Sequence, residues 1–111
     1  MHGETSPMLE RLQEFLRNNP KDSFVRYGYA MELSKLGRNA EALASFQQLT
    51  QDDPDYVAAY QQAAMLLARE GRKPEAKEMF RKGIEAAARK GNQHARSEMQ
   101  GMLQELEEID D

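Results

Sequence analysis

Side chains able to carry out chemistry are few in this chain of 111 residues. It has two histidines, His2 and His94, and no cysteine, which excludes a disulfide, a thiolate metal site and a thiol nucleophile. His94 and Glu98 are one helical turn apart and could share a metal ion, but two ligands make a weak site, and such pairs are commoner as ordinary surface residues. The sequence contains no glycine-rich phosphate loop, no Gly-x-Ser-x-Gly elbow and no acidic calcium loop. We therefore expect no enzyme activity, no cofactor and no bound metal.

Charge argues against nucleic acid as a partner. The chain has 15 basic and 19 acidic residues, and its net charge of −4 repels phosphate backbones. Acidic residues gather near the end, at Glu105, Glu107, Glu108, Asp110 and Asp111. The most basic zone comprises Arg81, Lys82, Arg89, Lys90 and Arg96. Because glutamates are interspersed in this zone, we expect a solvated helix face there rather than a site for an acidic partner or a phosphate.

The composition is that of one globular domain, with 40% hydrophobic and 31% charged residues. No stretch approaches the ~20 apolar residues that span a bilayer. The first residues lack the basic patch and apolar run of a secretory signal. We expect no membrane partner and a cytoplasmic location.

An internal repeat is the most informative feature of the sequence. The pattern Ala-Met-x-Leu-x-x-x-Gly-Arg-x-x-Glu-Ala-x-x-x-Phe begins at Ala30 and again 34 positions later at Ala64. Residues 23–54 and 57–88 share eight identities in all. A repeat of this length is typical of a solenoid, in which each unit stacks on the next because it cannot bury its apolar face alone.

Capping and turn residues divide the chain into six predicted helices. Ser6-Pro7 and Pro74 favour helix starts, whereas Gly37, Gly71 and Gly91 favour helix ends. The predicted helices are 7–18, 23–36, 39–51, 55–69, 74–90 and 93–109. We expect a disordered segment 1–6, a half repeat 7–22, repeats 23–56 and 57–90, a closing helix 91–109 and an acidic end 110–111.

The repeats resemble the tetratricopeptide repeat family. In the first unit the matching residues are Ala30, Leu33, Gly37, Ala42, Phe46 and Pro54. In the second they are Tyr60, Ala64, Leu67, Gly71, Ala76, Phe80 and Gly83. The resemblance implies an all-α fold of about six helices, in which antiparallel hairpins stack as a short right-handed solenoid. Departures from the pattern are Arg26 in place of a large aromatic, Leu49 in place of a small residue and Ala88 in place of proline.

Gly83 falls inside a predicted helix, where glycine costs about 1 kcal/mol relative to alanine. Close approach of a neighbouring helix is the simplest reason for a glycine there. We extend the same expectation to Gly28 and Gly101.

The resemblance also implies a binding surface, because in this family the first helices of successive repeats line a concave groove that receives a peptide. One stripe of these helices should pack inward, and the adjacent stripe should face the groove. The predicted groove residues are Phe24, Tyr27, Met31, Gln61, Met65 and Arg69. Tyrosine gives rigid contact area and methionine an adaptable one, so we expect a protein or peptide partner with an apolar segment.

Two other interpretations stay open. The closing helix could fold over the groove, so that Met99 and Met102 complete a core with Met31 and Met65. It could instead pair between identical chains and form a weak homodimer. The residues proposed for that pairing are Met99, Met102, Leu103 and Leu106.

Overall fold

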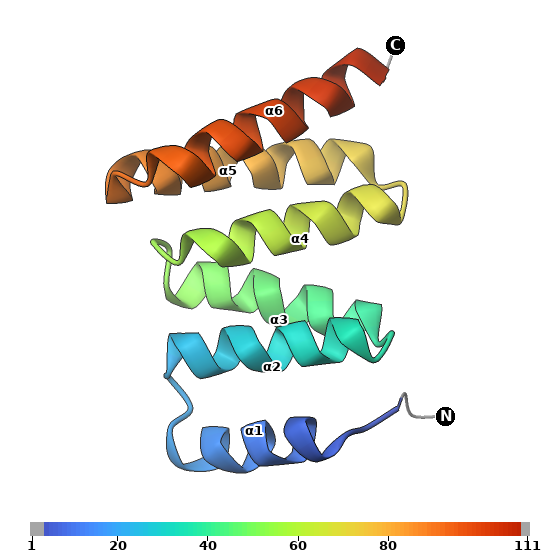
Figure 1. Cartoon of the computed structure of the whole chain (residues 1–111), viewed down its shortest axis with the longest axis vertical. Helices are drawn as coiled ribbons and strands as arrows, with labels where there is room; N and C mark the ends of the chain where they lie inside the picture. The colour runs from blue at the N-terminus through green and yellow to red at the C-terminus, as the bar shows by residue number, and fades with distance from the viewer. Residues whose placement is uncertain (1–3, 110–111) are drawn as a thin grey trace.

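Between residues 4 and 109, the part of the chain that the computed structural model describes, the fold consists of six helices and no strands. The helices are α1 (Pro7–Asn18), α2 (Ser23–Lys35), α3 (Asn39–Asp52), α4 (Val57–Arg69), α5 (Lys73–Lys90) and α6 (Gln93–Ile109). They stack in chain order, with α1 at one end and α6 at the other (Figure 1). The predicted all-α stack of helical hairpins is confirmed.

Local chemistry sets the helix ends as the sequence predicted. The Ser6 side chain accepts a hydrogen bond from the Leu9 N–H, which would otherwise lack a partner at the start of α1. Gly37, Gly71 and Gly91 have φ values of 80°, 79° and 69°, in the left-handed region that favours glycine. Each of these glycines therefore ends a helix and lets the chain turn back.

The start of α4 shows the largest difference from the predicted bounds. We expected this helix from about residue 55, but it begins at Val57. The Tyr56 N–H instead donates to the Asp53 carbonyl at 3.0 Å, which closes a turn before the helix.

Helix α5 is four residues longer than α3, with 18 residues against 14. Pro54, just past the end of α3, cannot continue a helix. Ala88 stands at the equivalent place 34 residues later and imposes no such limit, so α5 continues to Lys90. The departure from the family pattern at Ala88 thus lengthens a helix without altering the stack.

Apolar residues of the helices form two adjoining core clusters. The larger lies among α1 to α5 and contains Leu9, Ala30, Leu33, Ala42, Leu43, Phe46, Leu49, Ala59, Ala63, Leu66, Leu67 and Ala76. The smaller lies among α4, α5 and α6 and contains Ala64, Phe80, Ala87, Ala95 and Met99. The stripe predicted to pack inward consists of Arg26, Tyr29, Ala30 and Leu33 on α2 and of Tyr60, Ala63, Ala64 and Leu67 on α4. It is buried on α4, whereas on α2 Arg26 and Tyr29 are only half-buried.

Gly83 allows three helices to meet closely. A Cβ atom at this position would lie 2.7 Å from the Met99 sulfur on α6 and 2.8 Å from the Tyr60 Cβ on α4. The predicted close approach is confirmed here. It is wrong for Gly28, where the nearest atom would be at an ordinary 3.9 Å, and for Gly101, where nothing lies within 4 Å.

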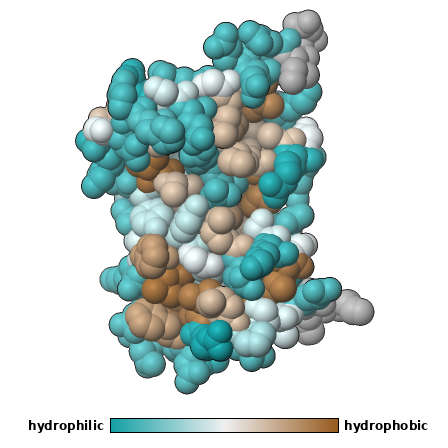
Figure 2. Space-filling model, viewed as in Figure 1, coloured by the Kyte–Doolittle hydropathy of each residue, from teal (hydrophilic) through white to brown (hydrophobic). Residues whose placement is uncertain are grey.

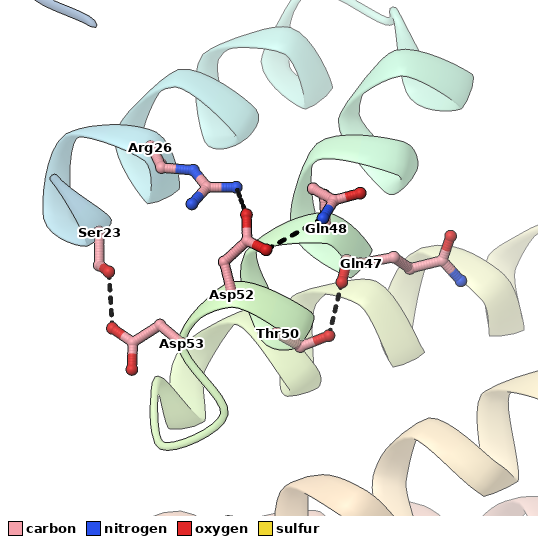
Figure 3. A network of polar contacts seen from close by, with 7 residues as sticks. All are labelled: Ser23, Arg26, Gln47, Gln48, Thr50, Asp52 and Asp53. Atoms are coloured by element: carbon pink, nitrogen blue, oxygen red, sulfur yellow. Dashed lines mark hydrogen bonds and ion pairs between the residues drawn. The ribbon is translucent and has the colours of Figure 1, made fainter. Parts of the chain in front are cut away.

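Polar contacts join α2 to the end of α3. The Arg26 guanidinium donates to Asp52 at 2.8 Å, and the Ser23 hydroxyl donates to Asp53 at 2.6 Å (Figure 3). Gln48 donates to the second Asp52 oxygen at 3.1 Å. Arg26 therefore replaces the aromatic residue of the family pattern with an ion pair between the two helices of one hairpin.

The segment before α1 has defined contacts in its described part. The Glu4 carbonyl accepts from Arg38 at 3.0 Å, and the Ser6 hydroxyl donates to Glu32 at 2.8 Å. Of the segment 1–6 that we expected to be disordered, residues 1–3 lie outside the described residues, as does the predicted acidic end 110–111. The division into a half repeat, two repeats and a closing helix stays a prediction.

Candidate functional site

Helices α2, α4 and α6 lie nearer the viewer in Figure 1, with α3 and α5 behind them. They form the face on which the sequence placed a groove. The six predicted groove residues lie on α2 and α4. The structure divides them into two groups that differ in their surroundings.

On α2, two of the three predicted residues are open to solvent. Phe24 is 76% exposed and Met31 is 39% exposed. Tyr27 is half-buried, because its ring lies 5.7 Å from that of Phe46 and 5.5 Å from that of Tyr56. Burial raises the pKa of the Tyr27 hydroxyl, and a hydrogen bond with Gln62 opposes that rise. Tyr27 thus packs between the two repeats, with only part of its surface toward the groove.

On α4, the predicted residues meet α6. The Gln61 amide donates to the Glu98 carboxylate at 2.8 Å and lies 3.8 Å from the Met102 sulfur. Met65 packs against the core cluster that contains Met99. Helix α6 therefore borders the groove along α4.

A pocket opens between the second halves of α4 and α6, over α5. Its volume is about 610 Å³. It is lined by Met65, Ala68, Arg69, Phe80, Met102, Glu105, Leu106 and Glu108. Apolar side chains dominate the lining, while Arg69 and the two glutamates supply both signs of charge. A pocket of this kind can accept an apolar side chain and orient polar groups beside it.

The alternative in which the closing helix completes a core is correct at one end of the groove only. Met99 is fully buried, and Met65 and Met102 pack against its cluster. Met31 does not belong to that cluster and remains partly exposed. Helix α6 thus covers part of α4 and leaves α2 open.

Burial of Met99 also corrects the residue set proposed for a homodimer. A side chain with no exposed surface cannot contact a second chain without unfolding its own core. Met102, Leu103 and Leu106 are half-buried against the same cluster. The predicted pairing surface therefore loses its central methionine.

Three of the residues weighed for metal or phosphate chemistry, Glu98, Arg81 and Arg89, have structural partners. Glu98, which lies one helical turn from His94, accepts a hydrogen bond from the Gln61 amide. In the basic zone Arg81 lies 3.2 Å from Glu107, and Arg89 lies 2.9 Å from Asp55. No group of three or more potential metal ligands occurs among residues 4–109, and His2 lies outside them. Within the same residues, no helix has the length and apolar character needed to cross a membrane.

Sequence reasoning missed the half of the pocket that comes from α5 and α6. Phe80 was noted only as a residue that matches the family pattern, and Glu105 only as one of the acidic residues near the end of the chain. Leu106 was considered only as a contact between chains. The apolar spacing of α6 could have indicated the pocket. Helix α6 follows a glycine turn after α5, so the repeat places it beside α4, in the same way that α4 lies beside α2.

Stacked hairpins with an open face define a helical-repeat scaffold. Residues 33–103 match the family model described as tetratricopeptide repeat. A tetratricopeptide repeat domain protein from Salinibacter ruber, solved by NMR, is 36% identical over 82% of this chain and 92% of its own, with a TM-score of 0.78. The chain belongs to the tetratricopeptide repeat family.

More distant structures share the fold. The TPR2B domain of yeast Sti1, solved in a complex with pHsp70, is 21% identical over 91% of this chain and 81% of its own, with a TM-score of 0.82. The type III secretion translocator chaperone SycD of Yersinia enterocolitica is 19% identical over 89% of this chain and 69% of its own, with a TM-score of 0.81. No curated protein matched the sequence.

Proposed function

We propose that this protein is an interaction module that binds a peptide or protein segment along the face of α2, α4 and α6, and that it has no catalytic role. The observation that carries the proposal is the apolar pocket between Met65 and Met102, at the end of a face that also exposes Phe24 and Met31. Apolar pockets with a few polar groups are where ligands anchor. Support also comes from the family, since the Sti1 domain of the same fold is solved with pHsp70.

In this proposal an apolar side chain of the partner enters the pocket and contacts Met65, Met102 and Leu106. Methionine adapts to side chains of different shape, so the pocket tolerates several apolar residues. Arg69 favours a carboxylate of the partner on one side, and Glu105 favours a basic group on the other. The rest of the segment extends across Tyr27 toward Met31 and Phe24.

A dimer through α6 is the less favoured alternative, because Met99 is in the core of its own chain. Two short repeats offer a small contact area, so we expect affinity in the micromolar range.

The test uses peptides selected from a random phage-displayed library against the purified protein. Binding of the selected peptides is then measured to Met65→Glu and Met102→Glu, each of which places a charge in the pocket. Gln100→Glu is the matched control, because it adds the same charge to an exposed position of α6. We expect the pocket variants to lose binding by about tenfold or more, since each such factor corresponds to about 1.4 kcal/mol. If folded pocket variants and the control bind the peptides equally well, the proposal is wrong.

A further inference from the structure

Apolar surface at the opposite end of the stack has no partner in the described chain. Among the described residues, the exposed large hydrophobic side chains are Met8 (47% exposed), Phe15 (44%), Phe24 (76%) and Met31 (39%). All four lie on α1 and α2. Because the two helices run antiparallel, Phe15 lies at the same end as Phe24, and Met8 at the same end as Met31. Figure 2 shows apolar side chains gathered over this part of the molecule, here named the α1–α2 surface.

The repeat shows that this exposure is unusual for the positions concerned. Residues 34 and 68 positions after Met8 and Phe15 occupy the same places in the two complete hairpins. They are Ala42 and Ala76 for Met8, and Leu49 and Gly83 for Phe15. All four are buried. The half repeat therefore exposes side chains that complete repeats cover.

A helix covers these positions in the complete hairpins. Helix α2 lies over α3, where Tyr27 contacts Phe46 in the same apolar row as Ala42 and Leu49. Helix α4 lies over α5 in the same way, and both α2 and α4 have 13 residues. No described helix occupies the equivalent place over α1 (Figure 1).

Charge at the end of α1 differs from charge at the end of α3. The end of α3 presents Asp52 and Asp53 to Arg26 and Ser23 at the start of the covering helix. Asn18 and Asn19 stand at the equivalent positions of the half repeat, so both carboxylates are absent.

Basic residues flank the same end of α1. Lys21 stands where the complete repeat has Asp55, and Arg17 stands where it has Gln51. Both side chains are exposed, and Lys21 also lies near Asp52 at the end of α3, so Arg17 is the less engaged of the two. A covering helix with acidic residues in its first turn would fit this end, and acidic residues also suit a helix start because of the helix dipole.

We propose that the α1–α2 surface is the seat of a single amphipathic helix from a partner protein. Its apolar stripe packs on Met8 and Phe15, and its acidic first turn lies beside Arg17 and Lys21. The helix has about 13 residues, the length of α2 and α4. It lies over α1 as α2 lies over α3. This surface shares Phe24 and Met31 with the face of the proposed function, but Met8 and Phe15 belong to this proposal alone and the pocket of α4 and α6 to the other alone. Variants at Phe15 and at Met65 therefore distinguish failure of one proposal from failure of the other.

A second copy of the chain is a poorer occupant. The helices that play the covering role, α2 and α4, have no acidic residue in the first turn, nor has α6. The one acidic residue at the start of a covering helix, Asp22, caps α2 by accepting a hydrogen bond from the Val25 N–H. A second copy therefore offers less negative charge to Arg17 and Lys21 than a helix with acidic residues in its first turn.

The probe is a fluorescein-labelled peptide with the sequence of residues 22–36, changed by Ser23→Glu and Arg26→Glu, and the comparison peptide keeps Ser23 and Arg26. Binding to the full chain is followed by fluorescence anisotropy, and peptide helicity by circular dichroism. A peptide this short is only marginally helical alone, so helicity should rise on binding. We expect the acidic peptide to bind about tenfold more tightly than the comparison peptide.

Variants of the chain locate the bound peptide. Phe15→Glu should weaken binding by about tenfold or more, whereas the α6 control Gln100→Glu and the pocket variant Met65→Glu should leave it unchanged. Arg17→Glu combined with Lys21→Glu should reverse the preference between the two peptides. Phe15 is exposed enough for its variant to fold, and Met8→Lys provides a second test at the other end of α1.

Three results would overturn the inference. One is the absence of binding at about 1 mM peptide. Another is binding that responds to Met65→Glu but not to Phe15→Glu, which would place the helix in the pocket and leave the proposed function intact. The third is self-association of the chain alone that Phe15→Glu abolishes, because a second copy would then occupy the surface.

Discussion

Replacing Gly83 by alanine should destabilise the protein, although alanine is the better helix former. Gly83 lies within α5 and is buried. The added Cβ would lie 2.8 Å from the Tyr60 Cβ and 2.7 Å from the Met99 sulfur. Met99 can turn its flexible side chain away, but the Tyr60 Cβ is attached directly to the α4 backbone. Helices α4 and α5 must therefore move apart.

The expected magnitude follows from two opposing effects. Extra volume in a packed core costs about 1–3 kcal/mol. Alanine recovers about 1 kcal/mol of helix propensity. The difference lies between about 0 and 2 kcal/mol, and we expect the free energy of unfolding to fall by about 1 kcal/mol, against a total of about 5–15 kcal/mol for a typical domain.

Gly101→Ala is the matched control, because Gly101 lies in a helix, is exposed and has nothing within 4 Å of the added Cβ. Its free energy of unfolding should rise by about 0.5–1 kcal/mol, because alanine has the higher helix propensity. Urea unfolding followed by circular dichroism at 222 nm measures both variants. If Gly83→Ala is as stable as Gly101→Ala, the close approach of α4, α5 and α6 does not limit the size of residue 83, and the reasoning is refuted.

Three further perturbations test other contacts. The hydrogen bond from Arg26 lowers the pKa of Asp52 below 3.8, so the pair stabilises the fold above about pH 4 and the contribution is lost as pH falls through the lowered pKa. In Asp52→Asn the free energy of unfolding, measured in urea at pH 2 to 7, should no longer show this fall at acid pH. If the variant keeps the pH profile of the unchanged protein, the Arg26–Asp52 pair does not cause the fall. Burial raises the pKa of Tyr27 and Tyr60 above 10.0. The resulting contribution to stability is present below pH 10 and is lost as the pH rises through the raised pKa values. Absorbance at 295 nm should therefore show that these tyrosines ionise at higher pH in the folded protein than in the unfolded chain. Titration of both tyrosines at pH 10 would contradict this. Ala88→Pro should cost about 3 kcal/mol or end α5 early, because proline inside a helix removes a hydrogen bond; unchanged helicity and stability would show that α5 already bends there.

Local chemistry explains why the helices could be predicted. Glycines at 37, 71 and 91 have the positive φ values that end helices. Ser6 accepts the hydrogen bond that starts α1. These features depend on neighbours within a few residues, so the sequence alone contains the information. The repeat then predicts stacking, because two similar hairpins bury similar apolar rows.

Packing between distant segments explains what could not be predicted. Gly28, Gly83 and Gly101 look alike in sequence, yet only Gly83 has helices at close distance. Tyr27 and Phe24 share a predicted stripe, yet contacts with Phe46 and Tyr56 cover much of the tyrosine ring.

The sequence by itself determined the six helices, the 34-residue repeat and the family, because these follow from capping residues, glycine turns and apolar spacing. Only the tertiary structure decided which side chains of the predicted groove are free. The packing of α6 beside α4 brings Glu98 to Gln61 and leaves a pocket beside Met65. Such contacts join residues more than 30 positions apart, and no local pattern in the sequence specifies how closely two helices approach.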